Sequence, residues 1–458
     1  MANSLIRTPV SNPATLEVVG HVDVLPADQL GDALVRAQGV QHSWADTDES
    51  SRRQCLADVS ELIEAETESL ARTLTLEQGK PLAQAQLEVG IAARAFAYFA
   101  TLSLEPEILR SDERQTVTRH FHPLGVAGLI TAWNFPLSLM AWKVAPAVLA
   151  GNAALVKPAP STPLASLALG HILDKVLPAG LVQVLTGDND LGQAIVEHPG
   201  IEKISFTGST ATGRRIMGAA APRLKRLTLE LGGNDAAIVL PDADVESTVL
   251  GIAAVAFRNA GQVCIAPKRV LVPAELEASI TEAFRDYLSE QIVGDGSVEG
   301  TTIGPVNNAA QQQFLVDLEL AARADGGKFH RTALNRADLP GYFVQPAVVT
   351  GLSPTSRLVR EEQFGPLLPI LTYGSVEQAV AMANDTDFGL GGSVWSTDKE
   401  RAATVADRVR SGTRWINQHG PAELDIPFGG AAQSGLGIEL GREGLHAYTE
   451  ARIKNIRN

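Results

Sequence analysis

The first hundred residues carry a helical pattern of apolar positions. Apolar side chains recur at helical spacing from about residue 27 to residue 104, and the segment 52–77 carries Leu56, Val59 and Ile63 on one face. Before this region, residues 16–22 form the clearest strand pattern in an otherwise irregular segment. The pattern therefore predicts a helical N-terminal region preceded by short strands.

From Gly125 onward, short apolar runs alternate with helical segments. The runs that predict strands are 126–131, 154–157, 182–186, 203–206 and 236–240, and helical candidates follow Thr162, Asp190 and Thr212. This alternation is typical of a parallel sheet with crossover helices. A second αβ series spans about 245–432, with strand signals at 270–272, 303–306, 343–349 and 393–395.

Two segments with strand-like alternation lie outside both series. They are residues 115–122 and the C-terminal residues 446–458. Exposed strand edges pair readily with other chains, so these two arms predict contacts between subunits. The alternative is that they pair only within the chain.

Length and charge narrow the class of protein. A chain of 458 residues is too long for one core and predicts two or three domains. The 38 basic and 52 acidic residues give a net charge of −14 with no long basic run, which argues against nucleic-acid and anionic-membrane partners. Two distant cysteines and a start without an apolar signal-peptide core favour a reducing, cytoplasmic setting.

One uncharged stretch, residues 124–142, is about as long as a membrane span. However, Gly125, Gly128, Asn134 and Pro136 interrupt it. Such residues within a membrane need protein partners, so we expect a buried strand, turn and helix and no membrane association.

Cys264 is the candidate nucleophile. It follows the apolar run 249–257 and the polar-containing segment from Arg258 to Gln262. A free cysteine is most often a buried hydrophobe, but Gly261 and Gln262 are poor core neighbours. No histidine lies near it in the sequence, so a Cys-His hydrolase is not supported.

Three polar residues end predicted strands, where α/β sheets bind ligands. Lys157 ends one apolar run, Glu230 ends another beside Gly232 and Gly233, and Asn134 follows the first strand of the series. An amide at that place can donate to a developing oxyanion. Solvent-exposed, capping or turn roles remain alternatives for all three.

The segment 208–213 offers a glycine turn at the start of a predicted helix, which can bind phosphate through backbone N–H groups. A plain strand–helix turn is an equal alternative, because the sequence has no Gly-x-Gly-x-x-Gly fingerprint. The sequence also lacks the common zinc and calcium motifs, and His120 and His122 fit a strand face better than a metal site. No metal is expected.

Seven segments together resemble the aldehyde dehydrogenase superfamily, in family order and over nearly the whole chain. They are Trp133-Asn-Phe-Pro, Lys157-Pro-Ala, Phe206-Thr-Gly-Ser-Thr, Glu230-Leu-Gly-Gly, Gly261-Gln-Val-Cys264, Glu362-Gln-Phe364-Gly-Pro and Pro427-Phe-Gly-Gly followed by Ser434-Gly. The resemblance implies an α/β fold with an atypical Rossmann cofactor domain (1–104 and 124–232) and an αβ catalytic domain (233–433). It also implies a β oligomerisation arm (105–123 and 445–458), and a homodimer or homotetramer.

The resemblance also implies a reaction, in which an aldehyde is oxidised to the acid with NAD(P)+. The Cys264 thiolate attacks the carbonyl, and the Asn134 amide with the Cys264 backbone N–H stabilises the oxyanion. After hydride transfer, Glu230 activates water to hydrolyse the thioester. A CoA-acylating relative and a non-enzymatic structural relative are the alternatives, and Glu230 favours water over CoA.

The same resemblance assigns cofactor and substrate residues. Lys157 would hold the adenosine ribose, Ser209 the pyrophosphate, Glu362 the nicotinamide ribose and Phe364 the nicotinamide, with Trp133 and Gly208 completing the cleft. Pro160 stands where many NAD-preferring members have a glutamate, so NADP is the alternative to the expected NAD.

Three further residues are expected in the substrate pocket. Arg258 matches an arginine that binds a distal carboxylate in succinic-semialdehyde dehydrogenases, while Trp142 takes the place of their second arginine. Ala422 replaces a bulky aromatic residue, which leaves room for a larger or aromatic aldehyde.

Overall fold

The helical N-terminal segment forms four helices in the computed structural model, which describes residues 6–335, 340–420 and 422–458. They are α1 (Leu30–Ala45), α2 (Glu49–Ala65), α3 (Thr67–Gln78) and α4 (Leu82–Ala100). An antiparallel hairpin precedes them, made of β1 (Ile6–Ser11) and β2 (Val18–Val24). The pattern predicted β2 but not β1, because Arg7, Thr8 and Pro9 leave β1 without a clear apolar alternation.

The first αβ series forms a six-stranded sheet in the order β19-β9-β8-β5-β6-β7. Its parallel strands are β5 (Val126–Ile130), β6 (Ala153–Lys157), β7 (Val182–Val184), β8 (Lys203–Thr207) and β9 (Arg226–Glu230). The crossovers contain α5 (Pro136–Leu149), α6 (Leu164–Leu173), α7 (Asn189–Glu197) and α8 (Thr210–Ala220). The predicted parallel sheet is confirmed, and the short antiparallel strand β19 (Gly435–Leu436) closes its edge at Glu230.

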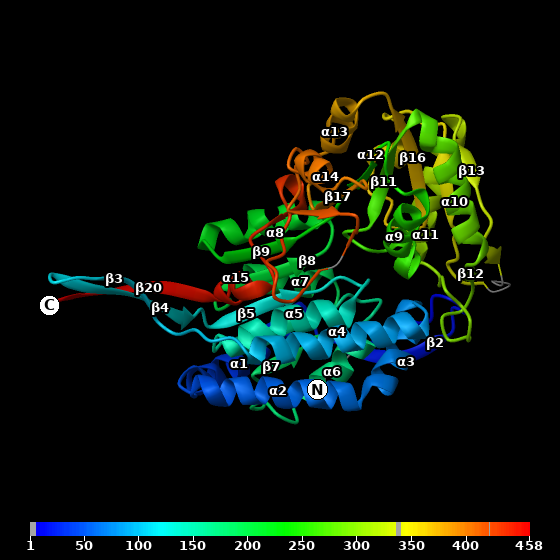
Figure 1. Cartoon of the computed structure of the whole chain (residues 1–458). Coiled ribbons are helices and arrows are strands. Elements are labelled where there is room, and N and C mark those ends of the chain that lie inside the picture. Colours follow the sequence, from blue (N-terminus) through cyan, green and yellow to red (C-terminus); the bar gives the residue numbers. More distant parts are fainter. Residues whose placement is uncertain (1–5, 336–339, 421) are drawn as a thin grey trace.

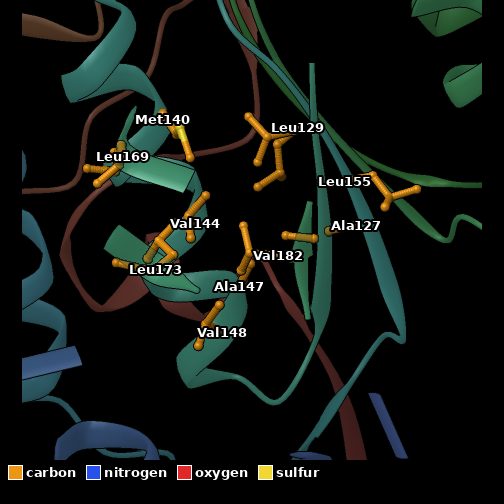
Figure 2. Packing of buried hydrophobic residues seen from close by; sticks show 14 of the residues in the cluster. Ala127, Leu129, Met140, Val144, Ala147, Val148, Leu155, Leu169, Leu173 and Val182 are labelled. Atoms are coloured by element: carbon orange, nitrogen blue, oxygen red, sulfur yellow. The ribbon is translucent and has the colours of Figure 1, made fainter. Parts of the chain in front are cut away.

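The core of this unit is aliphatic. Figure 2 shows Met140 and Val144 of α5 gathered with Leu169 of α6 on the helical side and Leu129 of β5 on the strand side. All four are buried. The stretch 124–142 is therefore a strand, a turn and a helix start, as predicted. No helix in the described residues is long and apolar enough to cross a membrane.

The second αβ series forms a seven-stranded sheet in the order β13-β15-β16-β11-β10-β17-β18. The strands are β13 (Lys328–His330), β15 (Ala347–Thr350), β16 (Leu367–Tyr373), β11 (Pro267–Pro273), β10 (Asp235–Val239), β17 (Gly391–Trp395) and β18 (Thr413–Ile416). Its helices are α9 (Val245–Ala256), α10 (Glu277–Ser289), α11 (Ala309–Ala324), α12 (Arg357–Arg360), α13 (Val376–Asn384) and α14 (Lys399–Ala406). In Figure 1 this unit lies above the first.

Two predicted strand assignments need correction. The strand pattern of β10 continues the first series, yet β10 pairs with β11 and β17 in the second sheet, because the chain crosses between sheets at Gly232 and Gly233. The predicted strand at 303–306 is wrong: Ile303 makes only an isolated bridge with Val293 in β12 (Ile292–Val293). Pro305 lacks the N–H that a ladder needs. β12 pairs with β14 (Leu334–Asn335) instead.

The two outlying strands meet in one arm. β4 (Gln115–Pro123) pairs along its length with β20 (Thr449–Arg457), and β3 (Glu107–Ser111) completes an antiparallel sheet. Figure 1 shows this sheet projecting from the rest of the molecule, with the short helix α15 (Gly441–His446) at its base. The arm exposes Ile108, Ile453 and Ile456. The two predicted strands are confirmed as strands that pair within the chain.

Candidate functional site

The loop that carries Cys264 has an unusual backbone. After α9 comes a 3-10 turn, η3 (Arg258–Gly261), in which Asn259 and Ala260 adopt φ values of 51° and 52°. Gly261 follows at φ +73°, and a Cβ there would clash with the carbonyl oxygen of Gly365. Only glycine can occupy this position, so Gly261 determines the shape of the loop that precedes Cys264.

Cys264 opens into a cavity of about 220 Å³ between the two sheets. The cavity is lined by Ala132, Trp133, Asn134, Thr207, Gly208, Ser209, Glu230, Leu231, Gly232, Cys264, Gln311, Glu362 and Phe364. The fold thus brings together residues from widely separated parts of the chain, from Trp133 to Phe364. All three predicted catalytic residues and five of the six predicted cofactor residues line it.

Glu230 and Cys264 face each other inside this cavity. Both side chains line the cavity, and the charge of Glu230 contributes to the pKa of the Cys264 thiol. Burial raises the pKa of Glu230 to about 8, with a further contribution from the nearby Glu439 carboxylate, while Lys143 opposes the shift. Burial, then the negative charges of Glu230 and Glu362, raise the pKa of the Cys264 thiol well above its ordinary value. Both groups therefore keep their protons to a higher pH than they would in water.

Asn134 is held between the two units. Its side-chain Nδ2 donates to the backbone carbonyl oxygen of Gln262 at 3.0 Å. Its backbone carbonyl oxygen accepts from Asn259 Nδ2 at 3.0 Å. A carboxamide nitrogen carries two protons, so one donor remains for a ligand in the cavity. Asn134 is buried within the turn that precedes α5.

Glu362 and Phe364 form the opposite wall. Glu362 Oε1 accepts from the backbone N–H of Gly233 at 3.0 Å, and a Cβ on Gly232 would clash with Glu362 Oε2. Burial raises the pKa of Glu362 to about 7, against the opposing charge of Lys268. The rings of Phe364 and Trp133 lie edge to face with centroids 5.3 Å apart. A planar aromatic group would find both an aromatic wall and a carboxyl acceptor here.

The N-terminus of α8 borders the same cavity. Gly208 and Ser209 end the turn after β8, and the Ser209 hydroxyl caps the helix by accepting from Thr212 N at 3.3 Å. The buried Thr207 hydroxyl has no hydrogen-bond partner in the described residues. A helix N-terminus with a free hydroxyl beside it suits a phosphate group.

Lys157 is the one predicted cofactor residue that does not line the cavity. It ends β6, and its Nζ donates to the Pro158 carbonyl at 3.3 Å. Its stem lies 3.5 Å from where a Cβ would stand on Gly192 at the start of α7. Burial lowers the pKa of Lys157 to about 8, with Asp188 opposing the shift.

None of the three predicted pocket residues lines this cavity. The Arg258 guanidinium lies over the Phe135 ring at 5.2 Å and makes no ion pair or hydrogen bond with any residue in the described segments. Trp142 and Ala422 are partly buried and pack against an apolar cluster beside Cys264. The cluster also contains Phe135, Val255, Val263, Ile265, Leu390, Trp415, Leu424, Phe428 and Leu440.

Several polar residues around the site were missed by the sequence analysis. Lys143 forms a buried ion pair with Glu439 below Glu230, and Ser205 donates to Glu439 at 3.1 Å. A second buried pair, Lys80 with Glu88, lies below Asn134. The available signal was a charged residue within an apolar helix pattern, which indicates a buried charge that needs a partner. Lys143, directly after the uncharged stretch 124–142, is such a residue. In the described residues, no His, Cys, Asp and Glu side chains cluster as metal ligands.

Comparison with known sequences identifies relatives over nearly the whole length of the chain. A sequence model described as the aldehyde dehydrogenase family matches residues 2–454. The geranial dehydrogenase of Castellaniella defragrans is 38% identical over 455 residues, which cover 96% of this chain and 94% of that protein.

Solved structures agree with this. An NADP-dependent enzyme of E. coli superposes with a TM-score of 0.96 at 32% identity, covering 99% of this chain and 95% of that one. Betaine aldehyde dehydrogenase from Staphylococcus aureus, in complex with NAD+, superposes with a TM-score of 0.95 at 31% identity, covering 99% and 92%.

Proposed function

Because the chain belongs to the aldehyde dehydrogenase family and oxidises aldehydes with NAD(P)+, we propose that Cys264 is its nucleophile. Asn134 is the oxyanion donor and Glu230 is the general base. The observation that carries this proposal is their convergence on one cavity, together with Glu362 and Phe364. A thiol, a carboxyl group and a free amide donor that line one cavity are the groups that covalent aldehyde oxidation requires.

The steps follow from the contacts. The Cys264 thiol loses its proton to solvent, and the thiolate sulfur attacks the aldehyde carbon to form a thiohemiacetal. The free Asn134 amide proton and the Cys264 backbone N–H bind the resulting oxyanion, an effect on the order of 3 kcal/mol for each donor. The bound cofactor supplies the acceptor for the hydride that leaves the thiohemiacetal carbon. Glu230 then removes a proton from the water that hydrolyses the Cys264 thioester.

For the cofactor, we propose NAD, with NADP as the alternative. The free Thr207 hydroxyl and the α8 N-terminus fit a pyrophosphate, and Glu362 fits a ribose hydroxyl pair. The aromatic wall of Trp133 and Phe364 fits a nicotinamide ring. Lys157, which ends β6 beside α7, is proposed to hold the adenosine ribose, as the family resemblance implies. One solved relative is described as NADP-dependent and another as an NAD+ complex, so the relatives support either cofactor.

For the substrate, we propose an aldehyde with an apolar or aromatic body. The apolar cluster beside Cys264, which includes Phe135, Trp142 and Ala422, supports this, as does the similarity to a geranial dehydrogenase. A second candidate, an aldehyde with a distal carboxylate, is supported by one observation. The largely buried Arg258 guanidinium has no carboxylate bonded to it in the described segments, and burial lowers its pKa. A substrate carboxylate would supply the missing partner.

The alternatives are less well supported. The CoA-acylating reaction is not favoured, because Glu230 faces the nucleophile, where it can activate water. The non-enzymatic alternative is not favoured either, because Cys264, Asn134 and Glu230 are all present in one cavity. We further propose that the exposed apolar residues of the arm make the chain a homodimer or homotetramer.

Cys264→Ala is expected to abolish aldehyde oxidation and to leave cofactor binding intact, because the side chain supplies the covalent bond but not the aromatic wall or the α8 N-terminus. Fluorescence titration with NADH and NADPH measures binding, and absorbance at about 340 nm, where the reduced cofactor absorbs, measures turnover. The matched control is Cys55→Ala, which changes the other thiol on α2, away from the site, and should retain full turnover. Appreciable turnover by Cys264→Ala would contradict the assignment.

Glu230→Gln is expected to slow thioester hydrolysis by about 10²–10⁴-fold while a burst of NAD(P)H still appears. The wild-type hydrolysis step should accelerate as pH rises through about 8, since the base must be ionised and its pKa is raised to about 8. Stopped-flow absorbance from about pH 6 to about pH 10, a window that brackets this pKa, measures both phases. Loss of the burst itself would instead place Glu230 in thiol activation alone.

Arg258→Leu is expected to change kcat/KM for apolar aldehydes by no more than about 3-fold and to lower it for ω-carboxylate aldehydes of equal length by about 10-fold or more. The reason is that a charge-assisted hydrogen bond contributes about 1.5–3 kcal/mol. Arg72→Leu on the exposed face of α3 is the matched control. Equal losses for both substrate series would remove Arg258 from carboxylate recognition.

Deletion of residues 449–458 is expected to convert the oligomer to a smaller species, because β4 would lose its partner β20 and the arm its apolar face. Size-exclusion chromatography with light scattering gives the mass. A wild-type mass equal to one chain would refute the oligomer proposal directly.

A further inference from the structure

Below the turn that carries Asn134 lies an ion pair with no exposed surface. Lys80 precedes α4, and Glu88 lies in the second turn of that helix. The two side chains are completely buried and are bonded to each other. Both residues belong to the N-terminal helical segment, far in sequence from the reacting groups.

Lys80 reaches directly to the residue that we assign to the oxyanion. Its Nζ donates to the backbone carbonyl oxygen of Asn134 at 2.7 Å and lies 4.0 Å from the centre of the Phe135 ring. The Lys80 ammonium thus bonds Glu88 and the Asn134 backbone and lies over the Phe135 ring. The Asn134 carbonyl therefore accepts two donors, Lys80 and Asn259.

Glu88 holds the next residues of the same segment. Its Oε1 accepts from Leu137 N at 2.9 Å and from Ser138 N at 3.3 Å, at the start of α5. Pro136, the first residue of α5, has no N–H, so these are the first two donors of the helix. A carboxylate at a helix N-terminus is stabilised by the helix dipole and by the unpaired N–H groups.

Stability alone gives a weak reason for this arrangement. A buried ion pair loses its hydration, and apolar residues of similar size often replace such a pair without loss of stability. What the pair does provide is geometry. It clamps the backbone of residues 134–138 from both sides, and it leaves the Asn134 side chain free to bond Gln262 and to face the cavity.

We propose that Lys80 and Glu88 are positioning residues that hold Asn134 in the place where its amide meets the oxyanion. The inference rests on the proposed role of Asn134. The Lys80 ammonium fixes the carbonyl, the Glu88 carboxylate fixes the following helix turn, and Gln262 fixes the amide. An amide displaced by about 1 Å loses much of its effect on the transition state, so the pair acts on rate through Asn134.

The test is a cycle between the pair and Asn134. The variant K80M/E88Q keeps no unpaired buried charge, and the carboxamide that E88Q introduces still offers an oxygen to the α5 N–H groups. The burst rate of NAD(P)H formation is measured at saturating aldehyde. N134A is expected to slow the burst by about 10²–10³-fold, and K80M/E88Q by about 10–100-fold. Adding K80M/E88Q to N134A should slow it by no more than about 3-fold further.

A second measurement separates positioning from general damage to the site. Alkylation of Cys264 by iodoacetamide, followed on the Cys264 peptide, forms no oxyanion, so K80M/E88Q should leave its rate within about 3-fold of the wild type. The matched control is Glu77→Gln. Glu77, near the end of α3, is also a buried residue whose carboxyl group caps the start of another helix. It accepts from Leu164 N at 2.6 Å and from Ala165 N at 2.9 Å, at the start of α6. Its burst should match that of the wild type.

The outcomes are distinct. If N134A leaves the burst unchanged, the proposed role of Asn134 fails and this inference fails with it. If N134A slows the burst but the losses multiply in the combined variant, or if K80M/E88Q has the wild-type rate, the pair does not act through Asn134. Far-UV circular dichroism and NADH binding report folding, and K80M alone, which leaves the Glu88 carboxyl group bonded to Leu137 N and Ser138 N, gives the same cycle if the double variant is unfolded.

Discussion

The site depends on a pair of reciprocal hydrogen bonds between two turns. The Asn134 amide donates to Gln262 O, and the Asn259 amide donates to Asn134 O, both at 3.0 Å. These bonds join the turn after β5 of one sheet to the nucleophile loop that leads into β11 of the other. Each sheet has its own core, so the relative position of Cys264 and its oxyanion donor depends on this junction. The strained loop from Asn259 to Gly261 is acceptable because the junction holds it.

Burial is the second constraint, and it sets the acid–base character of the site. Glu230 and Glu362 both have a raised pKa, and the Cys264 thiol does too. Desolvation is the first cause of each shift, so charge on these groups is costly until a partner arrives. Lys143 with Glu439 below Glu230, and Lys80 with Glu88 below Asn134, put paired charges beneath the reacting groups. Each of the two buried ion pairs thus lies next to one of the reacting groups.

The comparisons place the chain within the aldehyde dehydrogenase family over nearly its full length, and the features that bear on its choice of ligands lie at the margins of the cavity. Pro160, near Lys157, lacks a carboxylate that would oppose a 2′-phosphate. Arg258 lies over the Phe135 ring, and Phe135 belongs to the apolar cluster that includes Cys264. The residues proposed for cofactor choice and for substrate choice are therefore different sets, contributed by different parts of the chain.

Local sequence predicted the helical N-terminal region, the parallel strands of the first sheet and the two arm strands, and it pointed to Cys264, Glu230 and Asn134 as candidates, because apolar period and short motifs are local properties. It did not predict β1, and it wrongly predicted a strand at 303–306, where Pro305 cannot donate a ladder hydrogen bond. It also assigned β10 to the first sheet, because no local pattern shows that the chain crosses between sheets at Gly232 and Gly233. The tertiary structure alone decided which residues face each other: Glu230 against the Cys264 thiol, and Lys80 and Glu88 beneath Asn134. Contacts between residues far apart in sequence, and the burial that shifts their pKa values, depend on packing that no local pattern encodes.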